Sequence, residues 1–324
     1  MTSDSGAVGA QGVRAEWGEV PAGVRAEAEA RLGARIAAAE TQAGGFSPGV
    51  AARLRLTDGT RAFVKAVTAA ANPESPGIHR AEAKVAAALP REVPAPRLLA
   101  SFERDDWVVL LFEDIEGRTP AQPWDAAELE RVLTAVGDLA TLLTPSPVVV
   151  PLVAEANAEN FHGWRALAAE HAAGADDLTG LDPWAVRHLV ELAELEAGWA
   201  AAATGKTLAH ADLRADNLLL TADGRVMVVD WPWACLAAPW FDLLLMLPSV
   251  GMQGGPPPAE IFDRHPVAAG ADPDGVTAVL AAFAGFLLGH ARRPAPPGLP
   301  TLRPFQHAQG VVALDWLRTR TGWS

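Results

Sequence analysis

The sequence predicts an α+β protein built of two lobes, a small β-rich lobe followed by a larger helical lobe. Short β-type runs with hairpin dipeptides lie within the first ~115 residues, the chain beyond residue 125 has mainly helical patterns, and a polar, glycine-containing segment separates the two. We place the boundary between residues 116 and 117, which gives lobes of 1–116 and 117–324. Residues 1–15, small and polar, are expected to form a loose tail.

The first lobe begins with a helical pattern and a hairpin. An Ala-, Glu- and Arg-rich run over residues 21–42 predicts a helix that ends at Gly44-Gly45. Residues 50–57 and 60–67 have the composition of β-strands. The dipeptide Asp58-Gly59 between them is a strong signal for a tight hairpin turn.

The rest of this lobe alternates between helical and extended patterns. Apolar positions at helical spacing predict a helix over residues 78–89. Strands are expected at 98–102 and 107–112, the second fully buried because its residues are continuously apolar. The polar segment 113–119 is interpreted as a hinge.

The second lobe is predicted to be mainly helical, with a few short strands. One extended run ends at His210, and two more, residues 217–221 and 225–230, are joined by a turn at Asp223-Gly224. Apolar helices separated by Pro/Gly loops fill the last part of the chain. The longest uncharged apolar stretch, 276–289, is too short to cross a bilayer and is interpreted as a buried helix.

Composition excludes several classes of function. With 26 basic and 39 acidic residues the net charge is −13, so we expect no nucleic-acid partner. One cysteine cannot form an intrachain disulfide, a Cys-rich zinc site or an iron–sulfur cluster, and there is no tyrosine to serve as an acid or base. The start of the chain has no signal-peptide pattern, so we expect a cytoplasmic protein without a membrane partner. The sequence leaves the oligomeric state open.

The residues that carry chemistry gather at 210–217 and at Asp230. Asp212 is expected on a loop directly after a strand, where its carboxylate can meet a substrate hydroxyl. Asn217 offers a neutral oxygen and Asp230 a charged one, a pair suited to Mg²⁺, which keeps several waters and phosphate oxygens as its other ligands. Phosphoryl transfer needs such a set, a base to orient the hydroxyl and a metal to neutralise the phosphates.

The pattern H-x-D-x-x-x-x-N followed by an aspartate at a strand end resembles the catalytic core of the aminoglycoside phosphotransferase family, relatives of the protein kinases. Further motifs occur in the family's order between about residues 44 and 247. The resemblance implies a bilobal protein-kinase-like fold. The matching positions outside the core are the glycine-rich loop 44–49, Lys65, Glu82, the run 110–117 and Asp242.

The resemblance also implies a role for each matching residue. For the nucleotide, Lys65 would bridge the α- and β-phosphates and be held by Glu82. Ser47 would cap the β- or γ-phosphate, and the backbone of Glu113 and Ile115 would hydrogen-bond the adenine.

For the chemistry, Asp212 would be the base or the orienting carboxylate, with Asn217 and Asp230 as the Mg²⁺ ligands. Arg214 would neutralise the transferred phosphoryl group, with a surface ion pair as the alternative. His210 and Asp242 are interpreted as structural.

Two local features depart from simple patterns. Ala211 stands where the family has a glycine, and Trp231-Pro232 follows Asp230 in place of the Phe-Gly of protein kinases. Residues 200–207 fit a relaxed P-loop pattern, but a helix is predicted before them and a strand after them, the reverse of the order that a P-loop requires. We therefore interpret Gly205 as a helix cap.

These features together predict an ATP- and Mg²⁺-dependent kinase of a small hydroxylated molecule, with GTP as a second candidate nucleotide. The lobe 118–324 carries a net charge of −10, which favours a cationic substrate such as an aminoglycoside antibiotic. By analogy the activity would confer antibiotic resistance or self-resistance, with a nucleoside or peptide antibiotic as an equal alternative to an aminoglycoside. A kinase of a primary metabolite such as choline, homoserine or a sugar is the alternative enzyme. A non-catalytic nucleotide-binding protein is the alternative from another class.

Overall fold

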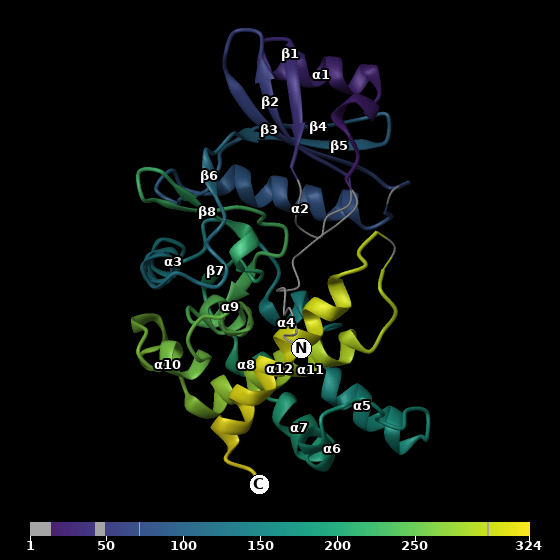
Figure 1. The fold of residues 1–324 in the computed structure, drawn as a ribbon, viewed down its shortest axis with the longest axis vertical. Coiled ribbons are helices and arrows are strands. Elements are labelled where there is room, and N and C mark those ends of the chain that lie inside the picture. Colours follow the sequence, from purple (N-terminus) through teal and green to yellow (C-terminus); the bar gives the residue numbers. More distant parts are fainter. Residues whose placement is uncertain (1–13, 43–48, 71, 297) are drawn as a thin grey trace, which may run out of the picture.

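The computed structural model describes residues 14–42, 49–70, 72–296 and 298–324, and its first lobe is built on a five-stranded antiparallel sheet (Figure 1). The strand order is β1-β2-β3-β5-β4. The strands are β1 (Ile36–Thr41), β2 (Val50–Leu56), β3 (Arg61–Thr68), β4 (Leu98–Arg104) and β5 (Trp107–Glu113). The hairpin predicted at Asp58-Gly59 is confirmed, with Ala51 of β2 opposite Lys65 of β3.

Helices cover both faces of β5, which explains why its apolar run is continuous. Val109 and Leu111 share a core with α1 (Ala22–Leu32). Leu110 and Phe112 point to the other face, where α2 (Ser75–Ala88) lies between the sheet and the helical lobe (Figure 1). Because successive side chains of a strand alternate between faces, a strand covered on both sides needs apolar residues throughout.

The prediction of one helix over residues 21–42 was wrong. The helix α1 ends at Leu32, where Gly33 adopts a left-handed conformation with a φ of 78°. The following Ile36–Thr41 is the edge strand β1, paired with β2. Its Ala- and Glu-rich composition favours a helix locally, but the sheet supplies backbone hydrogen bonds that composition does not reveal.

The second lobe is mainly helical, with two small sheets, and is connected to the first lobe by residues 114–116. The strand β6 pairs with β8 of the helical lobe, and the boundary at 116/117 stays a prediction. The helices are α3 (Ala126–Leu142), α4 (Val153–Ala156), α5 (Gly163–Ala172), α6 (Pro183–Arg187), α7 (Leu189–Glu196), α8 (Trp199–Ala202), α9 (Phe241–Met252), α10 (Pro258–Phe262), α11 (Pro273–Ala291) and α12 (Leu302–Thr321). The strands are β6 (Gly117–Arg118), β7 (Thr207–Ala209), β8 (Leu218–Thr221), β9 (Val226–Val228) and β10 (Cys235–Ala237).

The helix α11 forms the centre of this lobe. It packs against α12, α5 and α8, and a Cβ placed on Gly163 would lie 2.1 Å from the carbonyl oxygen of Gly285. The helix is longer than the apolar stretch 276–289 and reaches 19 residues, which is enough by length and composition to cross a membrane. Most of its surface is buried within the protein, as in the core helix of a globular protein.

The segment that resembles a P-loop has another structure. The helix α8 precedes it and the strand β7 follows it, which is the reverse of the P-loop order. Gly205 is not the cap of α8, since that position is Ala203. A Cβ on Gly205 would lie 2.1 Å from the carbonyl oxygen of Ala237, so the glycine permits close contact with the end of β10.

Candidate active site

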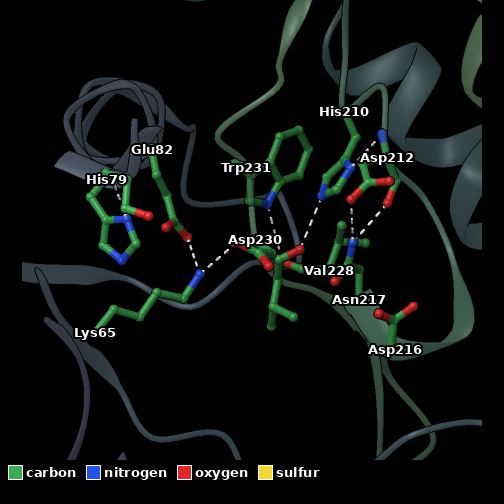
Figure 2. Close-up of polar contacts among 12 residues, drawn as sticks. Lys65, His79, Glu82, His210, Asp212, Asp216, Asn217, Val228, Asp230 and Trp231 are labelled. Carbon is green, nitrogen blue, oxygen red and sulfur yellow. Dashed lines mark hydrogen bonds and ion pairs between the residues drawn. The ribbon is translucent and has the colours of Figure 1, made fainter. Parts of the chain in front are cut away.

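The loop 210–217 connects β7 to β8 and is anchored by His210. The ring Nδ1 accepts a hydrogen bond from the amide of Asp212 at 3.2 Å, so the proton resides on Nε2, which donates to the Val229 carbonyl at 3.0 Å. Burial lowers the pKa of His210 to about 4, and the imidazole is neutral near pH 7. His210 therefore connects the loop to the residue that precedes Asp230 (Figure 2).

A second anchor comes from Asp242 in the first turn of α9. Its carboxylate accepts hydrogen bonds from the amides of His210, at 2.8 Å, and Ala211, at 2.7 Å. Ala211 has a φ of 63°, a left-handed conformation that favours glycine. Burial raises the pKa of Asp242 to about 6, opposed by the two amide bonds. Near pH 7 the ionised carboxylate holds a strained backbone immediately before Asp212.

Asp212 lies among a cation, an amide and two further carboxylates. Its carboxylate forms an ion pair with Arg214, whose guanidinium also binds Asp216 at 3.0 Å. The side-chain amide of Asn217 donates to the Asp212 carbonyl at 2.7 Å and to its carboxylate at 3.2 Å. Burial raises the pKa of Asp212 to about 7, opposed by Arg214 and increased further by the charges of Asp216 and Asp230. The group can therefore exchange a proton near neutral pH.

Lys65 connects the two lobes electrostatically. Its Nζ lies 2.6 Å from the carboxylate of Glu82 on α2 and 2.7 Å from that of Asp230 beyond β9 (Figure 2). Burial opposes the ionisation of Asp230, but Lys65 outweighs this effect and lowers the pKa of Asp230 to about 2. Burial raises the pKa of Glu82, whereas Lys65 opposes that rise. The structure thus brings together residues that are 165 positions apart in the chain.

The oxygen donors at this place fit Mg²⁺. The Val229 amide donates to the Asn217 carbonyl at 3.0 Å, so the side chains of Asn217 and Asp230 start from adjacent backbone. One carboxylate and one amide oxygen are hard ligands that leave positions for water and phosphate. Within the described residues there is no cluster of three or more His, Cys, Asp or Glu side chains able to hold a metal. The donor set suits a metal that shares its coordination with a substrate.

The hinge residues lie at the end of β5. The Glu113 amide donates to the Arg97 carbonyl at 2.9 Å, and the Ile115 carbonyl accepts from Arg53 at 3.1 Å. Both groups are therefore used within the lobe, and no described residue accepts a hydrogen bond from the Ile115 amide. Ser47, the remaining predicted nucleotide ligand, lies outside the described residues.

Sequence reasoning missed three neighbours of the site. His79 is buried one turn before Glu82 on α2, and burial together with the charge of Lys65 lowers its pKa to about 4. Phe305 of α12 lies under the Arg214 guanidinium, 5.6 Å from carbon to ring centroid. Asp216 is the third. The spacing of three between His79 and Glu82 could have indicated a shared helix face, whereas nothing local indicates Phe305.

Comparison with known proteins identifies the family. Residues 43–283 match the phosphotransferase enzyme family. A thermostable mutant of aminoglycoside phosphotransferase APH(4)-Ia, solved with ADP and hygromycin B, shares 15% identity with a TM-score of 0.60, over 93% of this chain and 99% of that one. Choline kinase LicA from Streptococcus pneumoniae shares 14% identity with a TM-score of 0.58, over 91% of this chain and 98% of that one. AMP-bound spectinomycin phosphotransferase APH(9)-Ia shares 13% identity with a TM-score of 0.55, over 90% of this chain and 97% of that one.

No curated protein sequence matches the chain significantly. The likeness to these solved structures confirms the predicted bilobal, kinase-like fold, and the family match covers the loop 210–217, Lys65 and Asp230. The chain belongs to the phosphotransferase enzyme family and is a phosphotransferase.

Proposed function

We propose that this enzyme transfers the γ-phosphate of ATP, with Mg²⁺, to a hydroxyl of a small molecule, most directly an antibiotic. One observation carries the proposal. Lys65 is bound to both Glu82 and Asp230, while Asp212 on the adjoining loop has its pKa raised to about 7. A cation suited to phosphate, a carboxylate suited to a metal and a candidate base thus lie together, and a non-catalytic relative would be expected to have lost one of them.

The nucleotide would bind between the lobes. Lys65 would contact the α- and β-phosphates and Glu82 would hold it there, with Ser47 as a further phosphate ligand. The adenine would accept a hydrogen bond from the Ile115 amide and donate one to the Glu113 carbonyl. This assignment uses the Ile115 group for which no described residue competes. ATP is proposed over GTP, which stays the second candidate.

Asn217 and Asp230 would hold the Mg²⁺ ion. When bound, the ion would neutralise phosphate charge and orient the transferred group. Asp230 carries a carboxylate whose pKa is lowered by Lys65, so it is ionised at any pH at which the enzyme works. Asn217 is buried and donates its amide hydrogens to Asp212, which couples the metal ligand to the base.

Asp212 would orient the acceptor hydroxyl and take up its proton. Its raised pKa places proton transfer near neutral pH, where a general base is most effective. Arg214 completes the proposed catalytic set. Its ion pair with Asp212 favours the charged form of the base, and its guanidinium would offset charge on the transferred phosphoryl group.

The acceptor is proposed to be a cationic, hydroxylated antibiotic, so that phosphorylation would confer resistance. The support is the −10 charge of the second lobe and the hygromycin B held by one structural neighbour. The choline kinase among the neighbours supports the alternative, a primary-metabolite kinase. We keep the cytoplasm as the expected compartment, with no nucleic-acid or membrane partner.

The test is ADP release from ATP and Mg²⁺ across hydroxylated antibiotics, choline, homoserine and sugars. The Asp212→Asn variant serves as the matched control. Turnover with an antibiotic and its loss in the variant would support the proposal. Turnover with a primary metabolite alone would favour the alternative substrate class. Nucleotide binding without turnover on any acceptor would favour the non-catalytic reading.

A further inference from the structure

The segment Arg14–Val20 is anchored against the first lobe. Ala15 donates from its amide to the Gly49 carbonyl at 3.1 Å, and Arg14 forms a parallel bridge with Gly49. Trp17 and Val20 are 5% and 1% exposed and pack in the core beneath the sheet. The expectation of a loose tail over residues 1–15 is therefore wrong for residues 14 and 15, while 1–13 lie outside the described residues.

This anchoring places the backbone of Arg14 beside the end of β2 that pairs with the Lys65 region of β3. Gly49 leads into β2, and two residues later Ala51 pairs with Lys65 of β3. Gly49 approaches β3 so closely that a Cβ would lie 2.7 Å from the Ala66 carbonyl oxygen. Arg14 thus lies next to Gly49, just before β2, which is the strand that pairs with the Lys65 strand β3.

The Arg14 side chain is half-buried, and the charge of Asp230 acts on it. Its Nε is buried. Burial lowers the pKa of Arg14 and the charge of Asp230 opposes that effect, while Arg14 in turn contributes to the lowered pKa of His79. Arginine stays protonated at every working pH, so Arg14 supplies a permanent positive charge there.

The charges of the site call for such a cation. Glu82 and Asp230 share the single charge of Lys65, and His79 is neutral near pH 7 because its pKa is lowered to about 4. The triphosphate of ATP would bring further negative charge, of which Mg²⁺ offsets only part.

Residue 14 also precedes the family match, which begins at residue 43.

We propose that Arg14 is a phosphate-binding residue, which the N-terminal segment adds to the nucleotide site from outside the family's matched region. The inference rests on the proposed function, since it takes ATP as the ligand. The guanidinium would contact the β- or γ-phosphate as a charge-assisted hydrogen-bond donor.

The experiment measures the affinity of the full chain for ATP and for adenosine by calorimetry, with and without Mg²⁺. The variants are Arg14→Ala, Arg14→Lys and, as a matched control, Arg35→Ala, which removes one exposed positive charge from the same lobe. Loss of one charge-assisted hydrogen bond is expected to weaken ATP binding by about tenfold, and more without Mg²⁺. Adenosine affinity should be unchanged, Arg14→Lys should recover part of the loss, and Arg35→Ala should bind like the wild type.

Each other outcome overturns the inference. If Arg14→Ala binds ATP with wild-type affinity, the contact between Arg14 and phosphate is refuted. The proposed function is then unaffected. Equal losses for ATP and adenosine would assign Arg14 a purely structural role. Absence of ATP binding by the wild-type chain would refute the proposed function and this inference together. A melting curve for each variant identifies a folding defect, and Arg14→Lys then provides the decisive comparison.

Discussion

Replacing Asp212 by asparagine tests two effects of this carboxylate, which are its contribution to the rate of phosphoryl transfer and the free energy lost by burying its charge. Asparagine keeps the shape and cannot accept a proton from the substrate. Because a positioned general base contributes about 10²–10⁴ in rate, we expect kcat to fall at least ~100-fold. Nucleotide affinity should be nearly unchanged, since the contacts of Lys65 with Glu82 and Asp230 do not include Asp212.

The same substitution is expected to stabilise the fold at alkaline pH. The pKa of Asp212 rises from 3.8 to about 7. At about 1.4 kcal/mol per pH unit this sets an upper limit of about 4 kcal/mol on the destabilisation by the ionised group. The side chain is 27% exposed and its ion pair with Arg214 is lost on substitution, so we expect about 2 kcal/mol.

The sign of the effect depends on pH. Because its pKa is raised, the protonated Asp212 makes its full contribution to the stability of the fold below pH 3.8. This contribution is lost as the pH rises, and above about pH 7 the ionised carboxylate destabilises the fold by the full amount. Asp212→Asn should therefore melt above the wild type at pH 8 and lose this advantage at pH 4.

The assays are differential scanning calorimetry at both pH values and a pH profile of wild-type kcat/KM, which should rise with a pKa near 7. Asp138→Asn makes the same chemical change at an exposed position of α3 and should alter neither property. A variant that melts below the wild type at pH 8 would refute the burial argument. A variant with undiminished turnover would refute the role as base.

Substitutions at three further positions test the surrounding geometry. Asp230→Ala should remove Mg²⁺-dependent nucleotide binding, and equal affinity by calorimetry would contradict the ligand role. Asp242→Ala leaves the amides of His210 and Ala211 without their acceptor. At about 1–3 kcal/mol for each unsatisfied buried donor, the free energy of unfolding should fall by about 3 kcal/mol, and an unchanged melting temperature would argue against this. Ala211→Val places a β-branched residue at a φ of 63° and should cost about 2 kcal/mol with slower turnover, whereas Ala211→Gly should remain active.

Local patterns predicted many elements of the fold. The dipeptide Asp58-Gly59 specifies a hairpin through its own backbone preferences, and the apolar run of β5 indicates burial on both faces. The strand Ile36–Thr41 could not be predicted, because its pairing partner lies beyond Gly49 in the sequence. Strand formation there depends on a neighbour and not on the residues themselves.

The candidate site divides in the same way. Motif spacing singled out Asp212 and Asn217, which share the loop between β7 and β8, and Asp230, which follows β9. It did not identify Phe305, which lies against Arg214, or Arg14, which is bridged to Gly49 and is proposed to contact phosphate. Their positions result from packing of the N-terminal segment on the sheet and of α12 on the helical lobe.

By itself the sequence determined the family, the order of the lobes and the chemical types at the site, because these depend on residue identity and on short spacings. Only the tertiary structure decided the ionisation of those residues. The pKa of Asp212 near 7 and the neutral state of His79 follow from burial and from charges contributed by distant segments. Desolvation and Coulomb interaction depend on distances in space, which the order of residues along the chain does not contain.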